Sequence, residues 1–228
     1  MTENFGQKEH QVGYLGSRDI DLGFVIDPNC DIEELRKCTM AKAISLLEGE
    51  GYIRHSSFRF CKFIHKDTGR ILTEQESKSI PQYDLFYLYV DMMVDRIHPK
   101  HKEIFGIDQL DEPVIEMALK QGRTVQVELD GAQIVIPEPE LLLTSKLKSL
   151  PGRQDGDKVW KDACDIYAIL WYSNKPFNSL VKYARINCAE NITLTIRRIN
   201  DDIANRAAKH LGIEVETFLR VLARLERN

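Results

Sequence analysis

Two aspartates, Asp19 and Asp21, stand at the start of a short apolar stretch and have the chemistry of metal ligands. Successive side chains of a β-strand point to opposite faces, so a strand over residues 20–26 puts both carboxylates on one face, roughly 6–7 Å apart. Gly23 is expected to leave that face open. Neighbouring carboxylates repel each other, and a bound divalent cation relieves the repulsion. The opposite face is expected to join the core through Ile20, Leu22, Phe24 and Ile26.

A solvated strand face explains the same pattern, because a D-x-D motif is short. A second predicted strand, residues 85–95, favours the metal. Its residues Leu88, Val90, Met92 and Val94 alternate as a core face, and Asp91 falls on the other face. A carboxylate in so apolar a strand is costly unless it is paired or ligated. We therefore predict Asp91 as the third ligand, whereas Asp95, near the strand end, is expected to be exposed.

Three carboxylates on adjacent strands form a site for Mg²⁺ or Mn²⁺. Two such ions hold the attacking and leaving oxygens of a phosphoryl displacement in line. The sequence contains neither the glycine-rich lysine loop of Walker-type ATPases nor the G-x-S-x-G of serine hydrolases. Phosphoryl-transfer chemistry on the acidic strand face is therefore the best-supported reaction class.

The elements that position these residues follow a strand-then-helix order. Asp31 and Glu34 form an acidic capping box for a helix that runs to about Leu47. The dipeptide Asp130-Gly131 predicts a hairpin between residues 123–129 and 133–136. We expect an α+β fold, with a mixed-sheet core over residues 1–139 and helices packed on one face of the sheet. A helical C-terminal domain is expected over residues 140–228.

Helices are predicted over residues 140–150, behind Pro139, and over residues 157–172. Asp162 and Asp165 lie three apart on one side of the second helix. Either they pair with Lys158 and Lys161, or one of them holds Lys146 from the preceding helix.

The composition bounds the function. The chain has 228 residues, 43% hydrophobic and 29% charged, as ordinary globular proteins have. No apolar run of 18 residues occurs and the N-terminus lacks the pattern of a signal peptide, so we expect a cytoplasmic protein without a membrane span. Five cysteines, with no C-x-x-C, indicate neither a disulfide framework nor a zinc knuckle. The net charge of −4 disfavours a protein that coats nucleic acid.

The chain's last two predicted helices have the rhythm of a helix-turn-helix. Residues 207–213 and 217–222 are apolar at helical spacing, with Gly212 at the turn between them. Such pairs are common in helical bundles that never contact DNA, so packing is the more frequent explanation.

Four other segments of the sequence resemble the nucleotidyltransferases of the DNA polymerase beta superfamily, most closely the minimal and abortive-infection toxin type. The carrying segments are G-S-R-D-I-D-L at residues 16–22, V-D at residues 90–91, L-T-S-K-L-K at residues 143–148 and K-D-A-C-D-I-Y at residues 161–167. The resemblance implies transfer of a nucleoside monophosphate from an NTP to a hydroxyl of RNA, protein or a small molecule, with Mg²⁺ or Mn²⁺ as cofactor. An antitoxin is a further partner that it implies.

The resemblance also implies residue roles. Asp19 and Asp21 would bind metal, and Asp91 would bind metal and help to activate the acceptor. Lys146 would contact nucleotide phosphates, and Asp165 would steady the helix pair or act beside it. The family carries a helix-opening glycine turn well before its D-x-D, whereas here Gly16-Ser17 stands two residues ahead of Asp19. Gly16 and Ser17 would perform a reduced version of that phosphate-binding role, and we expect poor activity from this polypeptide.

Three hypotheses follow. The first is a metal-dependent nucleotidyltransferase. The second is a degenerate, non-catalytic module that binds a nucleotide or an antitoxin. The third is a nucleic-acid-binding regulator that uses the last two helices.

Overall fold

A computed structural model describes residues 19–108, 110, 112–129 and 131–226. The chain divides into two compact units, one that ends at Gly122 and one that begins at Arg123. We call them the sheet unit and the helical unit and describe each by itself. In the described part of the chain no helix is both long and apolar enough to cross a membrane.

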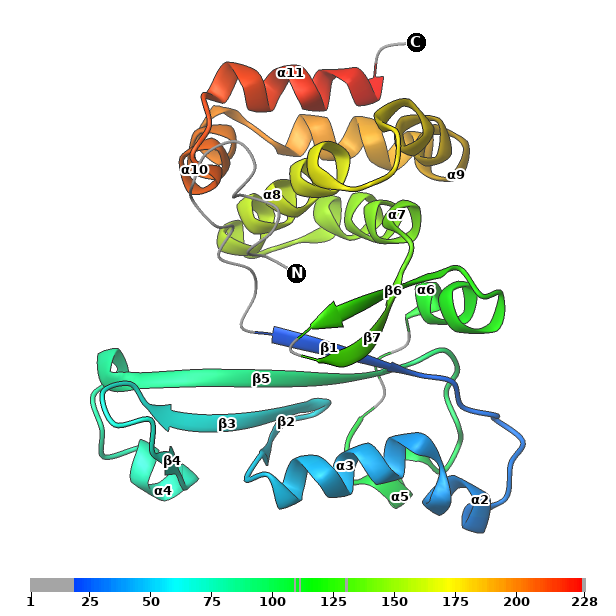
Figure 1. Cartoon of the computed structure of the whole chain (residues 1–228), viewed down its shortest axis with the longest axis vertical. Helices are drawn as coiled ribbons and strands as arrows, with labels where there is room; N and C mark the ends of the chain where they lie inside the picture. Colours follow the sequence, from blue (N-terminus) through cyan, green and yellow to red (C-terminus); the bar gives the residue numbers. More distant parts are fainter. Residues whose placement is uncertain (1–18, 109, 111, 130, 227–228) are drawn as a thin grey trace. The chain divides into compact units, whose positions relative to one another are not determined.

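The sheet unit is built on a mixed sheet with the strand order β1-β5-β3-β2 over the described residues, and β4 pairs with β3 (Figure 1). β1 is parallel to β5, whereas β3 runs antiparallel to β5, β2 and β4. The strands are β1 (Asp19–Phe24), β2 (Ile53–Ser56), β3 (Arg59–His65), β4 (Ile71–Leu72) and β5 (Leu85–Val94). A mixed sheet followed by helices agrees with the expected α+β class.

One face of this sheet carries the unit's main apolar core. Phe60, Val90 and Met92 project from it and are buried, with relative exposures of 2% or less. Three helices lie together on this side of the sheet (Figure 1): α2 (Ile32–Lys37), α3 (Thr39–Gly49) and α5 (His101–Phe105). Their inward side chains include Leu35, Met40, Ile44 and Phe105. Leu22 and Phe24 of β1 pack against the same core, as their alternation predicted, but Ile20 is 43% exposed.

The capping box of Asp31 and Glu34 is confirmed, because each side chain accepts the backbone N–H of the other residue. The helix that it opens is shorter than expected. Cys38 takes an extended conformation, with φ −64° and ψ 168°, and ends α2 while preceding α3. A single helix to Leu47 was therefore wrong, and the chain turns a corner at Cys38.

Short elements complete the sheet unit. They are α4 (Glu74–Ser77), η1 (Gln82–Asp84), α6 (Pro113–Ile115) and a π-helical turn η2 (Glu116–Lys120). On the second face of the sheet, a small apolar cluster of Cys61, Phe63, Leu72 and Leu85 lies beside the polar residues described below.

The helical unit begins with the predicted hairpin, in which β6 (Thr124–Leu129) pairs antiparallel with β7 (Ala132–Pro137). Gly131 of its turn has a φ of 79°, which glycine adopts without strain. The helices are α7 (Pro139–Ser149), η3 (Leu150–Gly152), α8 (Gly156–Tyr172), α9 (Phe177–Arg198), α10 (Asp201–Leu211) and α11 (Val215–Glu226).

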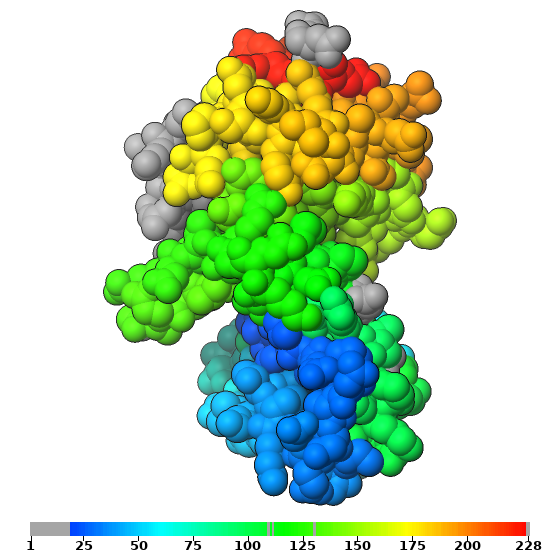
Figure 2. All heavy atoms as spheres, turned by 90° about the vertical axis from the view of Figure 1, so that its right-hand side faces the viewer, coloured from blue at the N-terminus to red at the C-terminus, as the bar shows by residue number. Residues whose placement is uncertain are grey.

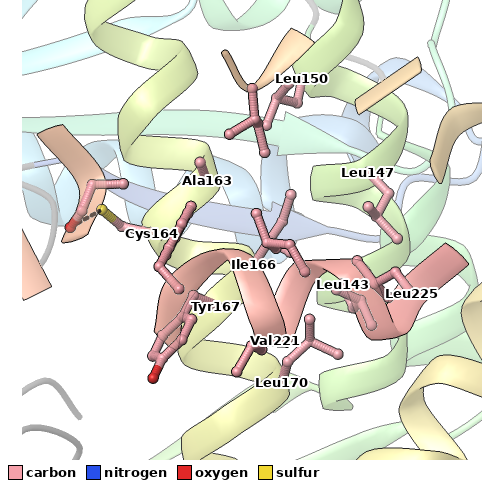
Figure 3. Packing of buried hydrophobic residues seen from close by; sticks show 14 of the residues in the cluster. Leu143, Leu147, Leu150, Ala163, Cys164, Ile166, Tyr167, Leu170, Val221 and Leu225 are labelled. Carbon is pink, nitrogen blue, oxygen red and sulfur yellow. Dashed lines mark hydrogen bonds between the residues drawn. The ribbon is translucent and has the colours of Figure 1, made fainter. Parts of the chain in front are cut away.

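Leucine, isoleucine and aromatic side chains fill the centre of the helical unit. Leu143 and Leu147 of α7, Ile166 and Tyr167 of α8 and Val221 of α11 meet there, each at most 2% exposed (Figure 3). In the space-filling view, α9, coloured yellow to orange, spreads across the visible face of this unit (Figure 2).

The hairpin groups with the helices, so the division falls before residue 123 rather than at the expected position after residue 139. Arg123 supplies the physical reason. Its guanidinium donates hydrogen bonds to Glu138 Oε2 at 2.9 Å and to Tyr183 Oη of α9 at 2.6 Å. These contacts tie the hairpin's open end to the helix that runs past it.

Candidate active site

Asp21 of β1 and Asp91 of β5 are direct register partners in the parallel strand pair. Asp19 lies two residues before Asp21 and is paired in the same way with Tyr89. Aligned residues of neighbouring strands project from the same face, and the strands lie about 4.8 Å apart. The register therefore places the three carboxylates on which the sequence hypothesis depends on one face of the sheet, on two neighbouring strands.

Arg59 of β3 completes this face of the sheet. It is the antiparallel register partner of Asp91, and its Nε and Nη2 donate to the two carboxylate oxygens at 2.5 and 2.6 Å. The Nη2 atom also lies 3.6 Å from Asp19 Oδ1. Such a bidentate pair is among the stronger protein hydrogen-bonding arrangements. The hydrogen bond with Asp91 raises the pKa of Arg59.

This ion pair is largely shielded from solvent. The Asp91 side chain is 9% exposed and that of Arg59 is 25% exposed, whereas Asp19 is 43% exposed. The pairing could not be predicted from the sequence, because it depends on the β3–β5 register.

One side of the Arg59 guanidinium packs against an aromatic ring, which in turn stacks on a second ring. The Arg59 Cζ atom lies 4.7 Å from the centroid of the Tyr89 ring, which gives a cation–π contact. Tyr89 stacks with Tyr87 at 6.0 Å between centroids and 17° between planes. Burial raises the pKa of the Tyr89 hydroxyl, so the ring stays neutral at physiological pH.

Asp95 corrects an expectation. The residue is 5% exposed rather than solvent-facing. Its Oδ1 accepts the Ile26 backbone N–H at 2.8 Å, and its Oδ2 lies 2.5 Å from Lys120 Nζ. Burial raises the pKa of Asp95, but the bonds from Lys120 and Ile26 outweigh burial and leave the pKa below its usual value. Asp95, just after β5, is therefore a structural ion-pair partner that joins η2 to the segment that follows β1.

Gly23 was expected to leave the acidic face open, but the structure shows that it does not. A Cβ built there would lie 3.0 Å from Ile115 Cγ1 and 3.1 Å from Cδ1. Ile115 of α6, itself 4% exposed, fills the space. The polar face is thus bounded by an apolar wall beyond Asp21.

The remaining predicted site residues lie elsewhere. Gly16 and Ser17 fall outside the described residues. Lys146 and Asp165 belong to the helical unit and pair with each other, with Nζ 2.7 Å from Oδ2. The same Nζ lies 2.9 Å from Asp162 Oδ1, and Arg153 Nε donates to Asp162 Oδ2 at 2.8 Å.

Lys146 of α7 thus pairs with aspartates of α8, which confirms the alternative in which an aspartate of the second helix holds Lys146. Burial lowers the pKa of Lys146, but the charges of Asp165 and Asp162 outweigh burial and raise it, so the lysine stays protonated. Contact with nucleotide phosphates stays a prediction.

The carboxylate oxygens of Asp19, Asp21 and Asp91 are donors that suit Mg²⁺ or Mn²⁺. No group of three or more histidine, cysteine or acidic side chains is gathered closely enough to share one metal among the residues that the structure describes. In the described structure both oxygens of Asp91 accept hydrogen bonds from the Arg59 guanidinium, so a cation at Asp91 would have to compete with Arg59.

Two cysteines are poor nucleophiles. Burial raises the pKa of Cys61 to about 11 and that of Cys164 to about 12, so both thiols stay protonated at neutral pH. Cys164 Sγ donates to the Ala207 carbonyl oxygen at 3.6 Å and packs in the core (Figure 3).

The helix pair α10–α11 is present, with Gly212 in the left-handed conformation at φ 68°. α11 buries Phe218, Val221, Leu222 and Leu225 against the helical unit. Glu214 and Glu216 stand at the start of α11, where a recognition helix would approach phosphates, and their charge opposes that approach. DNA binding by this helix pair stays a prediction, and the acidic residues at the start of α11 do not support it.

Comparisons with protein-family models, with curated proteins and with solved structures found no match.

Proposed function

We propose that the protein is a metal-dependent nucleotidyltransferase that moves a nucleoside monophosphate from an NTP to a hydroxyl of RNA, protein or a small molecule. The observation that carries the proposal is the register pairing of Asp21 with Asp91, with Asp19 on the same face. Three carboxylates from two adjacent strands are the ligand set that in-line phosphoryl transfer requires.

Each carboxylate has a role in this proposal. Asp19 and Asp21 would hold Mg²⁺ or Mn²⁺, and Asp91 would help to hold the ion and would accept the proton of the attacking hydroxyl. The ion, when bound, neutralises charge on the triphosphate and lowers the pKa of the hydroxyl. The hydroxyl oxygen forms the new bond to the α-phosphorus, and the bond to the bridging oxygen breaks, so pyrophosphate leaves.

A second candidate is a non-catalytic module that binds a nucleotide or an antitoxin. The bidentate Arg59–Asp91 ion pair favours it, because the guanidinium neutralises Asp91 without a metal. A sheet face that had lost its chemistry would keep such a pair for stability alone.

Equilibrium binding and label transfer separate the two candidates. The full chain is incubated with each of the four α-labelled NTPs, Mg²⁺ or Mn²⁺, and RNA or protein acceptors, and NTP binding is measured in parallel by calorimetry. The enzyme proposal expects metal-dependent binding and slow labelling. Both should be lost in Asp21→Asn and Asp91→Asn but kept in Asp67→Asn, which changes an exposed aspartate in the turn after β3.

Binding of NTP without transfer to any acceptor would favour the non-catalytic module. Absence of both binding and transfer, or equal transfer by all four proteins, would contradict the nucleotidyltransferase proposal.

A further inference from the structure

Arg59 places a positive charge among the carboxylates of the acidic face in the described structure. Its guanidinium bonds to both oxygens of Asp91 and lies within 3.6 Å of Asp19, so one positive group serves two of the three proposed metal ligands. The Tyr89 ring, 4.7 Å from Cζ, keeps the guanidinium over this face. A divalent ion and this guanidinium therefore compete for the same carboxylate.

The chemistry of arginine defines what can displace it. A guanidinium does not lose its proton at physiological pH, so its charge cannot be switched off. A second cation on Asp91 would break the bidentate pair and take the acceptor away from the N–H groups on Nε and Nη2. The same planar fork fits phosphate oxygens as well as carboxylate oxygens. A triphosphate that binds together with the ion would offer the Arg59 guanidinium new hydrogen-bond acceptors.

We propose that Arg59 is a phosphate-binding residue of the nucleotide site, held on Asp91 until a divalent cation takes its place and then transferred to the triphosphate. This inference rests on the proposed function. In the resting state Arg59 offsets the charge of Asp91 and lies near Asp19, and in the loaded state it offsets charge on the triphosphate.

The proposal predicts two effects of opposite sign. Replacing Arg59 by glutamine removes the competitor for Asp91, so a divalent cation alone binds more tightly. The same change removes a phosphate ligand, so a triphosphate binds more weakly in the presence of the cation. A residue with a merely structural role would shift both affinities in the same direction.

The experiment titrates Mn²⁺, followed by electron paramagnetic resonance, into the full-length wild type, Arg59→Gln, Arg59→Lys and the control Arg54→Gln. Arg54 is an ion-paired arginine of β2 whose register partner, Phe60, belongs to the opposite, apolar face. Inorganic tripolyphosphate is then titrated into each protein at saturating Mn²⁺, which makes the result independent of the NTP base.

The expected result for Arg59→Gln is Mn²⁺ affinity about tenfold higher and tripolyphosphate affinity about tenfold lower than in the wild type. Arg59→Lys keeps the charge but loses the fork, and should shift both affinities in the same directions by smaller factors. It also serves as the folded test protein if Arg59→Gln is unstable. Arg54→Gln should match the wild type.

The inference is overturned if Mn²⁺ binds no more tightly to the Arg59 variants, or if tripolyphosphate binding is unchanged in them. If Mn²⁺ binding is nevertheless lost in Asp91→Asn, the proposed metal site stands and only the role of Arg59 fails. If neither the wild type nor the Arg59 variants bind Mn²⁺, the proposed function fails together with the inference.

Discussion

Arg59 and Asp91 form a two-pronged ion pair across the β3–β5 register, with Nε–Oδ1 at 2.5 Å and Nη2–Oδ2 at 2.6 Å. The pair lies on the face of the sheet that also carries Asp19 and Asp21. This position makes Arg59 a competitor of the proposed metal ion for Asp91, and we expect the ion pair to contribute to folding stability.

Arg59→Gln should destabilise the sheet unit. Removing one partner of a buried ion pair leaves the other charge uncompensated, which costs about 3 kcal/mol. Urea unfolding in EDTA, followed by far-UV circular dichroism, measures the loss. Arg54→Gln breaks an ion pair whose side chains are about half exposed and should cost less than about 1 kcal/mol. Equal losses in the two variants would contradict the special position of Arg59.

The sheet unit should lose stability in mild acid through His101. This histidine is fully buried, neither ring nitrogen has a hydrogen-bond partner among the described residues, and burial lowers its pKa to about 4. The unfolded state therefore takes up a proton as the pH falls below about 6.5, while the folded state resists it until about pH 4.

The free energy of unfolding should drop by about 2 kcal/mol between pH 7.5 and pH 5 on this account. The slope should disappear in His101→Leu and persist in His55→Gln, which changes an exposed histidine of β2. A wild-type slope retained by His101→Leu would contradict the assignment. The depressed pKa of Asp95 contributes stability that is lost only at lower pH, as the pH falls below its ordinary value of 3.8.

Lys146→Met should loosen the helical unit. The change leaves Asp162, whose side chain is 7% exposed, with Arg153 alone, and it removes the bond to Asp165. A cost of about 2 kcal/mol is expected. Trp160 and Trp171, the chain's two tryptophans, both belong to α8, so tryptophan fluorescence during urea unfolding reports on this unit.

Lys148→Met is the matched control, since Lys148 lies on the same helix and is exposed. An unchanged midpoint in Lys146→Met, or an equal shift in both variants, would show that the Lys146 ion pairs contribute no stability.

Gly23→Val should destabilise β1. Although valine favours strands, its Cβ would meet Ile115 at 3.0 Å, and such overpacking costs about 1–3 kcal/mol. Combining it with Ile115→Ala should recover part of that cost, a coupling that circular dichroism of the single and double variants measures. Strictly additive losses would mean that Ile115 does not limit the space at Gly23.

Local signals in the sequence predicted local structure well. The Asp31–Glu34 capping box, the hairpin turn at Gly131 and the helix behind Pro139 each depend on residues within a few positions of one another. A carboxylate in an apolar strand needs a partner, and on that ground Asp91 was expected to lie with Asp19 and Asp21. The β1–β5 register places all three on the same face of the sheet.

Features that depend on register could not be derived in this way. Arg59 was visible as one basic residue among several, but its pairing with Asp91 follows from the alignment of β3 with β5. The burial of Asp95 depends on Lys120, 25 positions away, and the wall at Gly23 depends on Ile115. No periodicity in the sequence encodes these long-range contacts.

The central claim is that the acidic face of the sheet holds a divalent cation, and Mn²⁺ binding tests it most directly. Electron paramagnetic resonance titrations of the wild type, Asp21→Asn, Asp91→Asn and the exposed control Asp67→Asn give the four affinities. The account predicts saturable binding to the wild type and to Asp67→Asn, and binding at least about tenfold weaker in Asp21→Asn and Asp91→Asn. Equal Mn²⁺ affinity in all four proteins would contradict it.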